Sequence, residues 1–117
     1  MLRKVRLEAA RGPEFPDGSA SHGYELALPL SAAAALDRDT WHKHRTECRF
    51  RRFWAGQEDA VGHLAHDRGG WRLAFDDGSG DAEVIVKADA HRFAAGDYVS
   101  IKERDGVTRT FRIAAVA

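Results

Sequence analysis

The segment 44–66, which reads "HRTECRFRRFWAGQEDAVGHLAH", concentrates side chains that could do chemistry. It contains four arginines, three histidines and the only cysteine of the chain, together with two phenylalanines and a tryptophan. Histidine and thiolate groups bind zinc, a cysteine beside a base can act as a nucleophile, and arginines among aromatic rings can hold an anion or a nucleobase. Each of these sites requires its own spacing of residues, and the spacing decides among them.

The histidine spacing does not favour a metal site. His42 and His44 are two residues apart on a predicted helix, so their rings diverge, and His63 and His66 are three apart on a predicted strand, so they face opposite sides. The spacing matches no zinc pattern. We therefore expect no metal and no cofactor, and a site would have to combine the weak candidates His44, His63, His66 and Cys48.

Cys48 is predicted to be a core residue. His44 lies four residues before it and Arg49 directly after it, which is the setting of a reactive thiolate. However, strand alternation puts Cys48 on the same face as Phe50 and Trp54, and buried cysteine behaves as a small apolar side chain. Because one cysteine cannot form an intrachain disulfide, we expect a reducing compartment, the cytoplasm.

A basic and aromatic strand face is the candidate binding surface. Six Lys/Arg and two Asp/Glu lie between Arg38 and Trp54. Phe53 falls on the face of Arg49 and Arg51, where an apolar ring is not expected, and an exposed ring among arginines is typical of a contact surface. The predicted surface residues are Arg45, Arg49, Arg51, Phe53 and His63.

Three functions are compatible with these residues, and non-catalytic binding is favoured over catalysis. The first is a module that binds a protein partner or forms a homodimer through the basic face, and the second binds RNA or single-stranded DNA through the same face. The third is a metal or small-molecule site built from the histidines and Cys48. No phosphate-binding loop, nucleophile elbow or His-Glu-x-x-His helix is present in the sequence, so it names no substrate or reaction.

The elements that must position these residues are mostly short strands. Apolar residues alternate with polar ones in several segments separated by Gly-containing turns, which predicts antiparallel β-structure. The predicted strand segments are 3–9, 22–30, 48–55, 59–66, 69–75, 82–88 and two within 93–116. One short helix is expected over residues 38–45, with Asp37 preferred to Ser31 as its N-cap. The sequence thus predicts an all-β small barrel or sandwich of about seven or eight strands.

The last hairpin has a specific expected register. A two-residue turn at Asp105 and Gly106 would pair Ile101 with Thr110 and put the two apolar sets on opposite faces. We therefore predict an odd-length connection, three residues that include Gly106 in a left-handed conformation.

Two resemblances support a single compact domain. The stretches "HGYE", "WHKHRTECRFRRFW", "GHLAH" and "HRFAAGDYVSI" together resemble a small bacterial family of uncharacterised proteins. The C-terminal segment "FAAGDYVSI…GVTRTFRIAAV" also resembles the closing strands of many small β-barrel domains. Neither resemblance implies a mechanism.

A length of 117 residues predicts one domain over residues 1–117. The charge and the hydropathy limit the partners of this domain. The formal net charge is zero, so no global field attracts nucleic acid or an anionic membrane. The start, "MLRKVRLEAA", lacks the apolar core of a signal peptide, and no apolar run is long enough for a membrane span, so we expect no membrane partner.

Overall fold

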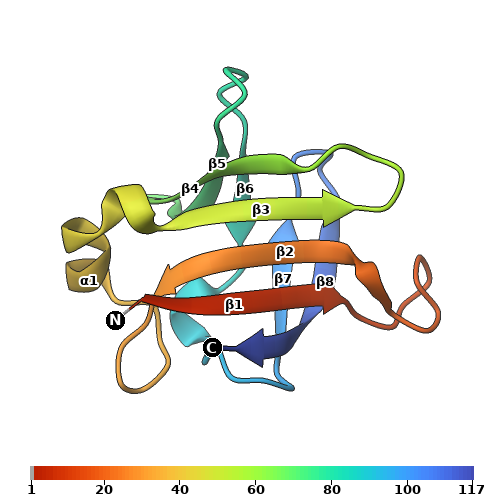
Figure 1. Cartoon of the computed structure of the whole chain (residues 1–117), viewed down its shortest axis with the longest axis horizontal. Helices are drawn as coiled ribbons and strands as arrows, with labels where there is room; N and C mark the ends of the chain where they lie inside the picture. Colours follow the sequence, from red (N-terminus) through yellow and green to blue (C-terminus); the bar gives the residue numbers. More distant parts are fainter. Residues whose placement is uncertain (1) are drawn as a thin grey trace.

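The computed structural model describes residues 2–117, which form a closed antiparallel barrel (Figure 1). Its eight strands are β1 (Leu2–Ala9), β2 (Ser19–Pro29), β3 (Arg49–Trp54), β4 (Ala60–Asp67), β5 (Gly70–Phe75), β6 (Ala82–Ile85), β7 (Tyr98–Lys102) and β8 (Thr108–Val116). Each strand pairs with the next one in sequence, and β8 pairs with β1 to close the sheet. The all-β prediction is confirmed, and of its two alternatives the barrel is the correct one.

Alternate connections lie at opposite ends of the barrel. We call the end that carries the β1–β2, β3–β4, β5–β6 and β7–β8 connections the mouth. The other end carries the helical segments α1 (Arg38–Lys43) and η1 (Arg45–Glu47) between β2 and β3, and η2 (Ala88–Ala90) between β6 and β7. In residues 2–117 no helix has the length and apolarity that crossing a bilayer requires.

The predicted helix is confirmed in position but is shorter than expected. It begins after Asp37, whose carboxylate accepts a hydrogen bond from Thr40 Oγ1 at 2.5 Å. The α-helical turns end at Lys43, and the chain continues as the 3-10 turn η1. Trp41 anchors the helix over the end of the barrel, because it is 4% exposed and its indole nitrogen donates to the Leu64 carbonyl at 3.0 Å.

The barrel interior is filled by the alternating residues that the sequence assigned to it. On β1 and β2 the residues Val5, Leu7, Tyr24 and Leu26 are buried, and Trp71 is buried on β5. Antiparallel strands with one face on the core produce this alternation. Eight strands enclose a space that side chains can fill, so the interior is a packed core.

The last hairpin has the predicted odd-length connection. Ile101 pairs with Arg109, and the Glu103 amide donates to the Val107 carbonyl at 2.9 Å, which leaves a three-residue turn. Gly106 has φ +86°, the left-handed conformation that glycine adopts without steric cost. This register gives Glu103 and Arg109 the same parity as Ile101, so both enter the barrel at its mouth.

Candidate functional site at the mouth of the barrel

The predicted surface residues are only partly brought together. Arg49 pairs directly with His63 across β3 and β4, and Arg51 lies on the same outer face. Arg45 lies apart on η1, where its guanidinium group stacks over the Trp41 ring at 4.6 Å from the ring centre.

The expectation of an exposed Phe53 is wrong. The residue faces outward with Arg49 and Arg51, as predicted, but it is only 9% exposed. The guanidinium carbons of Arg6 and Arg51 lie 4.5 Å and 5.2 Å from its ring centre and cover it. Gly23 on the adjacent strand leaves room for the ring, because a Cβ there would lie 3.1 Å from the Phe53 ζ carbon. An apolar ring on an outer face is thus buried by long arginine side chains.

The charges on this outer face are paired with one another. Arg49 donates to Asp76 at 2.7 Å, and the His63 ring nitrogen Nδ1 lies 2.9 Å from the same carboxylate. Arg51 donates to Asp59 at 2.7 Å and also contacts Glu25. The pKa of Asp76 is lowered, first by its hydrogen bond with His63 and then by that with Arg49.

The metal candidates do not converge. Cys48 is fully buried, as predicted, and burial together with the charge of Glu47 raises the pKa of its thiol to about 11. His44 lies 3.5 Å from Glu47, whereas His66 packs against the Trp71 ring. Across residues 2–117 no group of three His, Cys, Asp or Glu side chains is placed to hold a metal ion.

The sequence analysis missed a buried ionic cluster at the mouth. Among the described residues, Glu83 and Glu103 are the buried charged side chains, at 1% and 3% exposure. Arg52 Nε and Arg109 Nη1 each donate to Glu103, both at 2.8 Å. The Tyr24 hydroxyl contacts both carboxyl groups, at 2.5 Å from Glu83 Oε1. We call these residues the mouth cluster: Tyr24, Arg52, Glu83, Glu103 and Arg109.

Hydrogen-bond counting favours Glu83 as the protonated carboxyl group of the pair. A phenol carries one hydrogen, so Tyr24 can donate to only one of the two carboxyl groups, and the other must donate to it. Glu103 already receives two charged guanidinium groups. Glu83 receives one backbone amide, from Arg104 at 3.0 Å, and burial raises its pKa. This arrangement favours the proton on Glu83, with Glu83 donating to the Tyr24 oxygen and the Tyr24 hydroxyl donating to Glu103.

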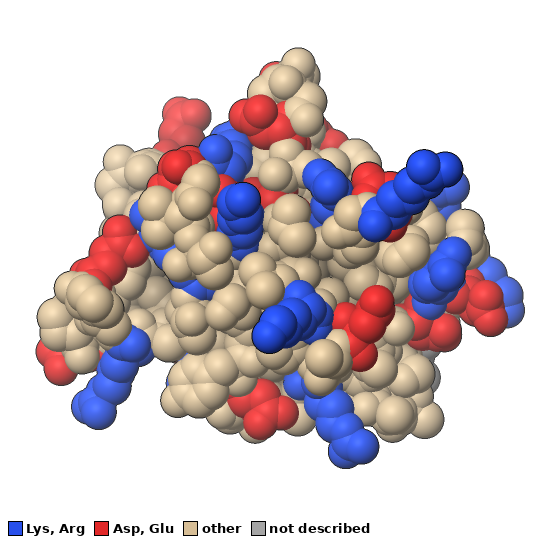
Figure 2. Space-filling view, turned by 180° about the vertical axis from the view of Figure 1, so that it is seen from behind, with Lys and Arg blue, Asp and Glu red and all other residues tan. Residues whose placement is uncertain are grey.

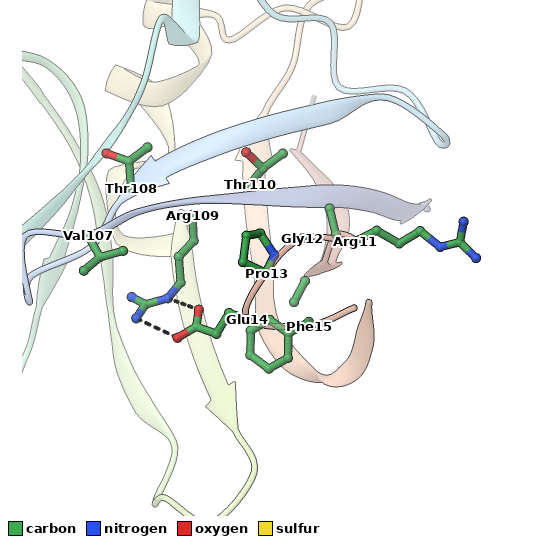
Figure 3. A pocket seen from close by; sticks show the side chains of 11 residues that line it. Arg11, Gly12, Pro13, Glu14, Phe15, Val107, Thr108, Arg109 and Thr110 are labelled. Carbon is green, nitrogen blue, oxygen red and sulfur yellow. Dashed lines mark hydrogen bonds and ion pairs between the residues drawn. The ribbon is translucent and has the colours of Figure 1, made fainter. Parts of the chain in front are cut away.

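Arg109 connects this cluster to the surface. Its Nη1 atom donates to Glu103 and to Asp105, at 2.8 Å and 2.9 Å. Its Nε and Nη2 atoms donate to the two oxygens of Glu14, at 2.7 Å and 3.2 Å, in a bidentate pair (Figure 3). The Glu14 hydrogen bond is the largest cause of the raised Arg109 pKa, and it lowers the pKa of Glu14.

Aromatic rings flank the arginines of the mouth cluster. The guanidinium carbon of Arg52 lies 3.9 Å from the centre of the Trp54 ring, and that of Arg109 lies 5.5 Å from it. Phe15 and His22 pack edge-on against Trp54, with ring centres at 5.7 Å and 4.7 Å. A cation over an aromatic face is held electrostatically, so these rings orient both arginines.

A cleft of about 440 Å³ opens beside Arg109, between the β1–β2 loop and the start of β8. Figure 3 shows Arg109 and Glu14 facing each other at this cleft, while Arg11 points away from them. The lining residues are Ala9, Ala10, Arg11, Gly12, Pro13, Glu14, Phe15, Val107, Thr108, Arg109 and Thr110. A concave site of this size beside buried ionisable groups is a candidate ligand site.

Inward parity was the signal that could have revealed the mouth cluster. Glu83 alternates in step with Ile85, and Glu103 follows Val99 and Ile101 at the same parity. A charged residue at a core position of a strand requires a partner.

Comparison with protein-family models, curated proteins and solved structures gave no match to this chain. The resemblance to a small bacterial family therefore stays a prediction.

Proposed function

We propose that this protein is a non-catalytic binding module that takes a small molecule into the cleft at the mouth of the barrel. The observation that carries the proposal is the ionic mouth cluster, which ends in Arg109 at the wall of that cleft. Buried charges are costly, and a barrel filled with apolar residues would be stable without them. Arg109, which these buried charges hold, lines the cleft, and this supports a role in recognition.

Several features support binding rather than catalysis. The nucleophile candidate Cys48 is buried in the core with a raised pKa, so it is a thiol at neutral pH. Glu83, Tyr24 and Glu103 lie behind Arg109 and do not line the cleft. A general acid or base must reach the proton that it transfers, and these groups are separated from a ligand in the cleft. A cytoplasmic location remains part of the proposal, supported by the free thiol.

Two equally exposed valines provide a matched test. Val107 lines the cleft and is 46% exposed, whereas Val61 lies on β4 and is 48% exposed. Two-dimensional NMR of the protein with a library of small fragments should show shifts at residues 9–15 and 107–110. Val107→Lys should abolish them by filling the cleft, and Val61→Lys should leave them unchanged. Fragment-induced shifts confined to β3 and β4, or none at all, would contradict the proposal.

Contact with a protein partner or a second copy is the second candidate. The specific observation is Val61, an exposed apolar residue that pairs with Arg51 in the register and lies among Arg49 and His63. Sedimentation equilibrium is expected to show a homodimer that Val61→Lys dissociates and Val107→Lys does not. A monomer at every concentration would contradict self-association, and contact with a different protein would remain as the second candidate.

Nucleic-acid binding through the same face has weaker support. Arg49 and Arg51 each donate to a carboxylate, so phosphate binding would require them to exchange partners. The opposite face, shown in Figure 2, has acidic and basic side chains interspersed. If the outer face bound single-stranded RNA, affinity would fall steeply as salt rises, and titration at two salt concentrations measures this slope.

A further inference from the structure

We propose that the ligand of the mouth cleft is a small monocarboxylate with an apolar body, which binds the Nε–Nη2 edge of Arg109 in place of Glu14. This inference rests on the proposed function, because it names the chemistry that the same cleft selects. Glu14 then acts as an internal ligand that occupies the site when the external one is absent.

The guanidinium group of Arg109 is held through its Nη1 atom, and its Nε–Nη2 edge faces the cleft. Buried Glu103 and the turn residue Asp105 hold its Nη1 atom, and the Trp54 ring lies beside its guanidinium plane. The group is therefore oriented independently of Glu14. Its Nε and Nη2 atoms face the cleft, and this pair of donors matches the two oxygens of a carboxylate.

Glu14 is suited to be displaced. Its side chain is 52% exposed, and it comes from the β1–β2 connection, where backbone hydrogen bonds from Gly12 and Gly18 to the Phe15 carbonyl hold the turn. Those bonds do not involve the Glu14 carboxylate, so its side chain can rotate away while the turn persists. The Arg109 side chain is only 16% exposed, so a ligand carboxylate must match the bidentate contact that it replaces, and its net affinity comes from the apolar body that Glu14 lacks.

Charge favours a monoanion over phosphate. Arg109 is already shared with Glu103 and Asp105, so exchanging Glu14 for one carboxylate leaves the negative charge in direct contact with Arg109 unchanged. A phosphate dianion would bring additional negative charge close to those two carboxylates, which is unfavourable.

The cleft walls favour an apolar body on that carboxylate. Pro13, Phe15 and Val107 line the cleft and give it apolar walls. Burying an alkyl chain against such residues gives the hydrophobic part of the affinity, whereas the bidentate Arg109 contact fixes the orientation.

Calorimetric titration of hexanoate, with hexanamide as the uncharged analogue, tests the inference. Wild-type protein should bind hexanoate at least about tenfold more tightly than hexanamide, since a charge-assisted pair on Arg109 is worth more than a neutral hydrogen bond. Glu14→Gln should raise the hexanoate affinity by about threefold to tenfold, because the competing ion pair is lost. Glu58→Gln removes the same charge from the exposed β3–β4 connection and should leave the affinity unchanged.

The NMR signal of the Arg109 Nε–H group locates the ligand in the same samples. It should shift when hexanoate binds, and the remaining spectrum of Glu14→Gln should show that the fold is intact. Equal binding of hexanamide and hexanoate at the mouth would overturn the carboxylate inference and leave the proposed function standing. Hexanoate affinity that does not respond to Glu14→Gln would overturn the internal-ligand role. No binding of either probe to wild type or to Glu14→Gln, together with no fragment-induced shifts at the mouth, would overturn both proposals.

Discussion

The Tyr24 hydroxyl contacts two buried carboxyl groups and influences which of them is protonated. Its oxygen lies between Glu83 and Glu103, and its one hydrogen cannot serve both. The two arginines at Glu103 and the burial of Glu83 decide which carboxyl group keeps the proton. The two glutamates, although equally buried, should therefore respond differently to the same substitution.

Glu83→Gln should change the free energy of unfolding by no more than about 1 kcal/mol at about pH 4, where the acid is protonated in the folded and the unfolded state, because the carboxamide can donate to Tyr24 and accept from the Arg104 amide as the protonated acid does. Wild type should lose stability as pH rises from the ordinary glutamate value of 4.5 through the raised folded value, since the folded state then holds a proton that the unfolded state has released. The variant should lack this loss. Urea unfolding between about pH 4 and about pH 9 measures both effects.

Glu103→Gln should be much more costly. It leaves the Arg52 and Arg109 guanidinium groups facing an uncharged amide in a largely buried site, and we expect a loss of about 2–4 kcal/mol at neutral pH. The same urea series measures it. Equal losses for Glu83→Gln and Glu103→Gln would contradict the placement of the proton.

Among the elements, the contact between β1, β2 and β3 shows why an outward-facing ring is buried. Phe53 on β3 lies over Gly23 on β2, and Arg6 from β1 covers it. A Cβ at Gly23 would lie 1.9 Å from the Leu7 carbonyl oxygen, so β1 can approach β2 this closely only because the residue is glycine. Glu8 pairs with Gly23, and the register of β1 against β2 shifts directly after it, between Glu8 and Ala9.

Gly23→Ala should therefore destabilise the protein by about 3 kcal/mol or more, because the new methyl group can be accommodated only by separating β1 from β2. Gly12→Ala is the control, since a Cβ at Gly12 would meet no atom within 4 Å. Thermal unfolding followed by circular dichroism compares the two variants with wild type. A Gly23→Ala protein as stable as Gly12→Ala would show that β1 and β2 are not packed as described.

For the whole molecule, the carboxyl groups with lowered pKa values and Glu83, whose pKa is raised, change the stability in opposite directions as pH varies. Surface carboxylates in hydrogen bonds and ion pairs have lowered pKa values: Glu14, Asp37, Asp76, Asp77 and Asp105. Their contribution is present above the ordinary carboxyl values and is lost as pH falls through the lowered ones. The contribution of Glu83 has the opposite sign and is lost as pH rises.

The melting temperature should therefore be highest in mildly acidic solution, at about pH 4–5, and should fall on both sides. High salt should reduce the loss on the acidic side, because the surface pairs are screened, and should affect the loss due to buried Glu83 less. Differential scanning calorimetry across pH, at low and high salt, measures this profile. A maximum at neutral or alkaline pH, or the same profile for Glu83→Gln, would contradict it.

The sequence by itself determined which side chains face inward, because alternation along one strand is a local property. It placed Val5, Tyr24 and Phe50 inside, identified the short helix, and established the odd-length turn at Gly106, since only that register puts Ile101 and Phe111 on one face. It could not choose between a barrel and a sandwich. Both architectures produce the same alternation, and only the pairing of β1 with β8 closes the sheet.

The tertiary structure decided which inward and outward residues meet. Glu103 contacts Arg52, which is 51 residues away, because closure of the barrel brings β3 and the β7–β8 hairpin to the same mouth. Glu14 reaches Arg109 from 95 residues away for the same reason. Phe53 is covered by Arg6, a contact set by the order of three neighbouring strands. Alternation fixes the face of each residue, whereas its partners depend on pairing between distant segments.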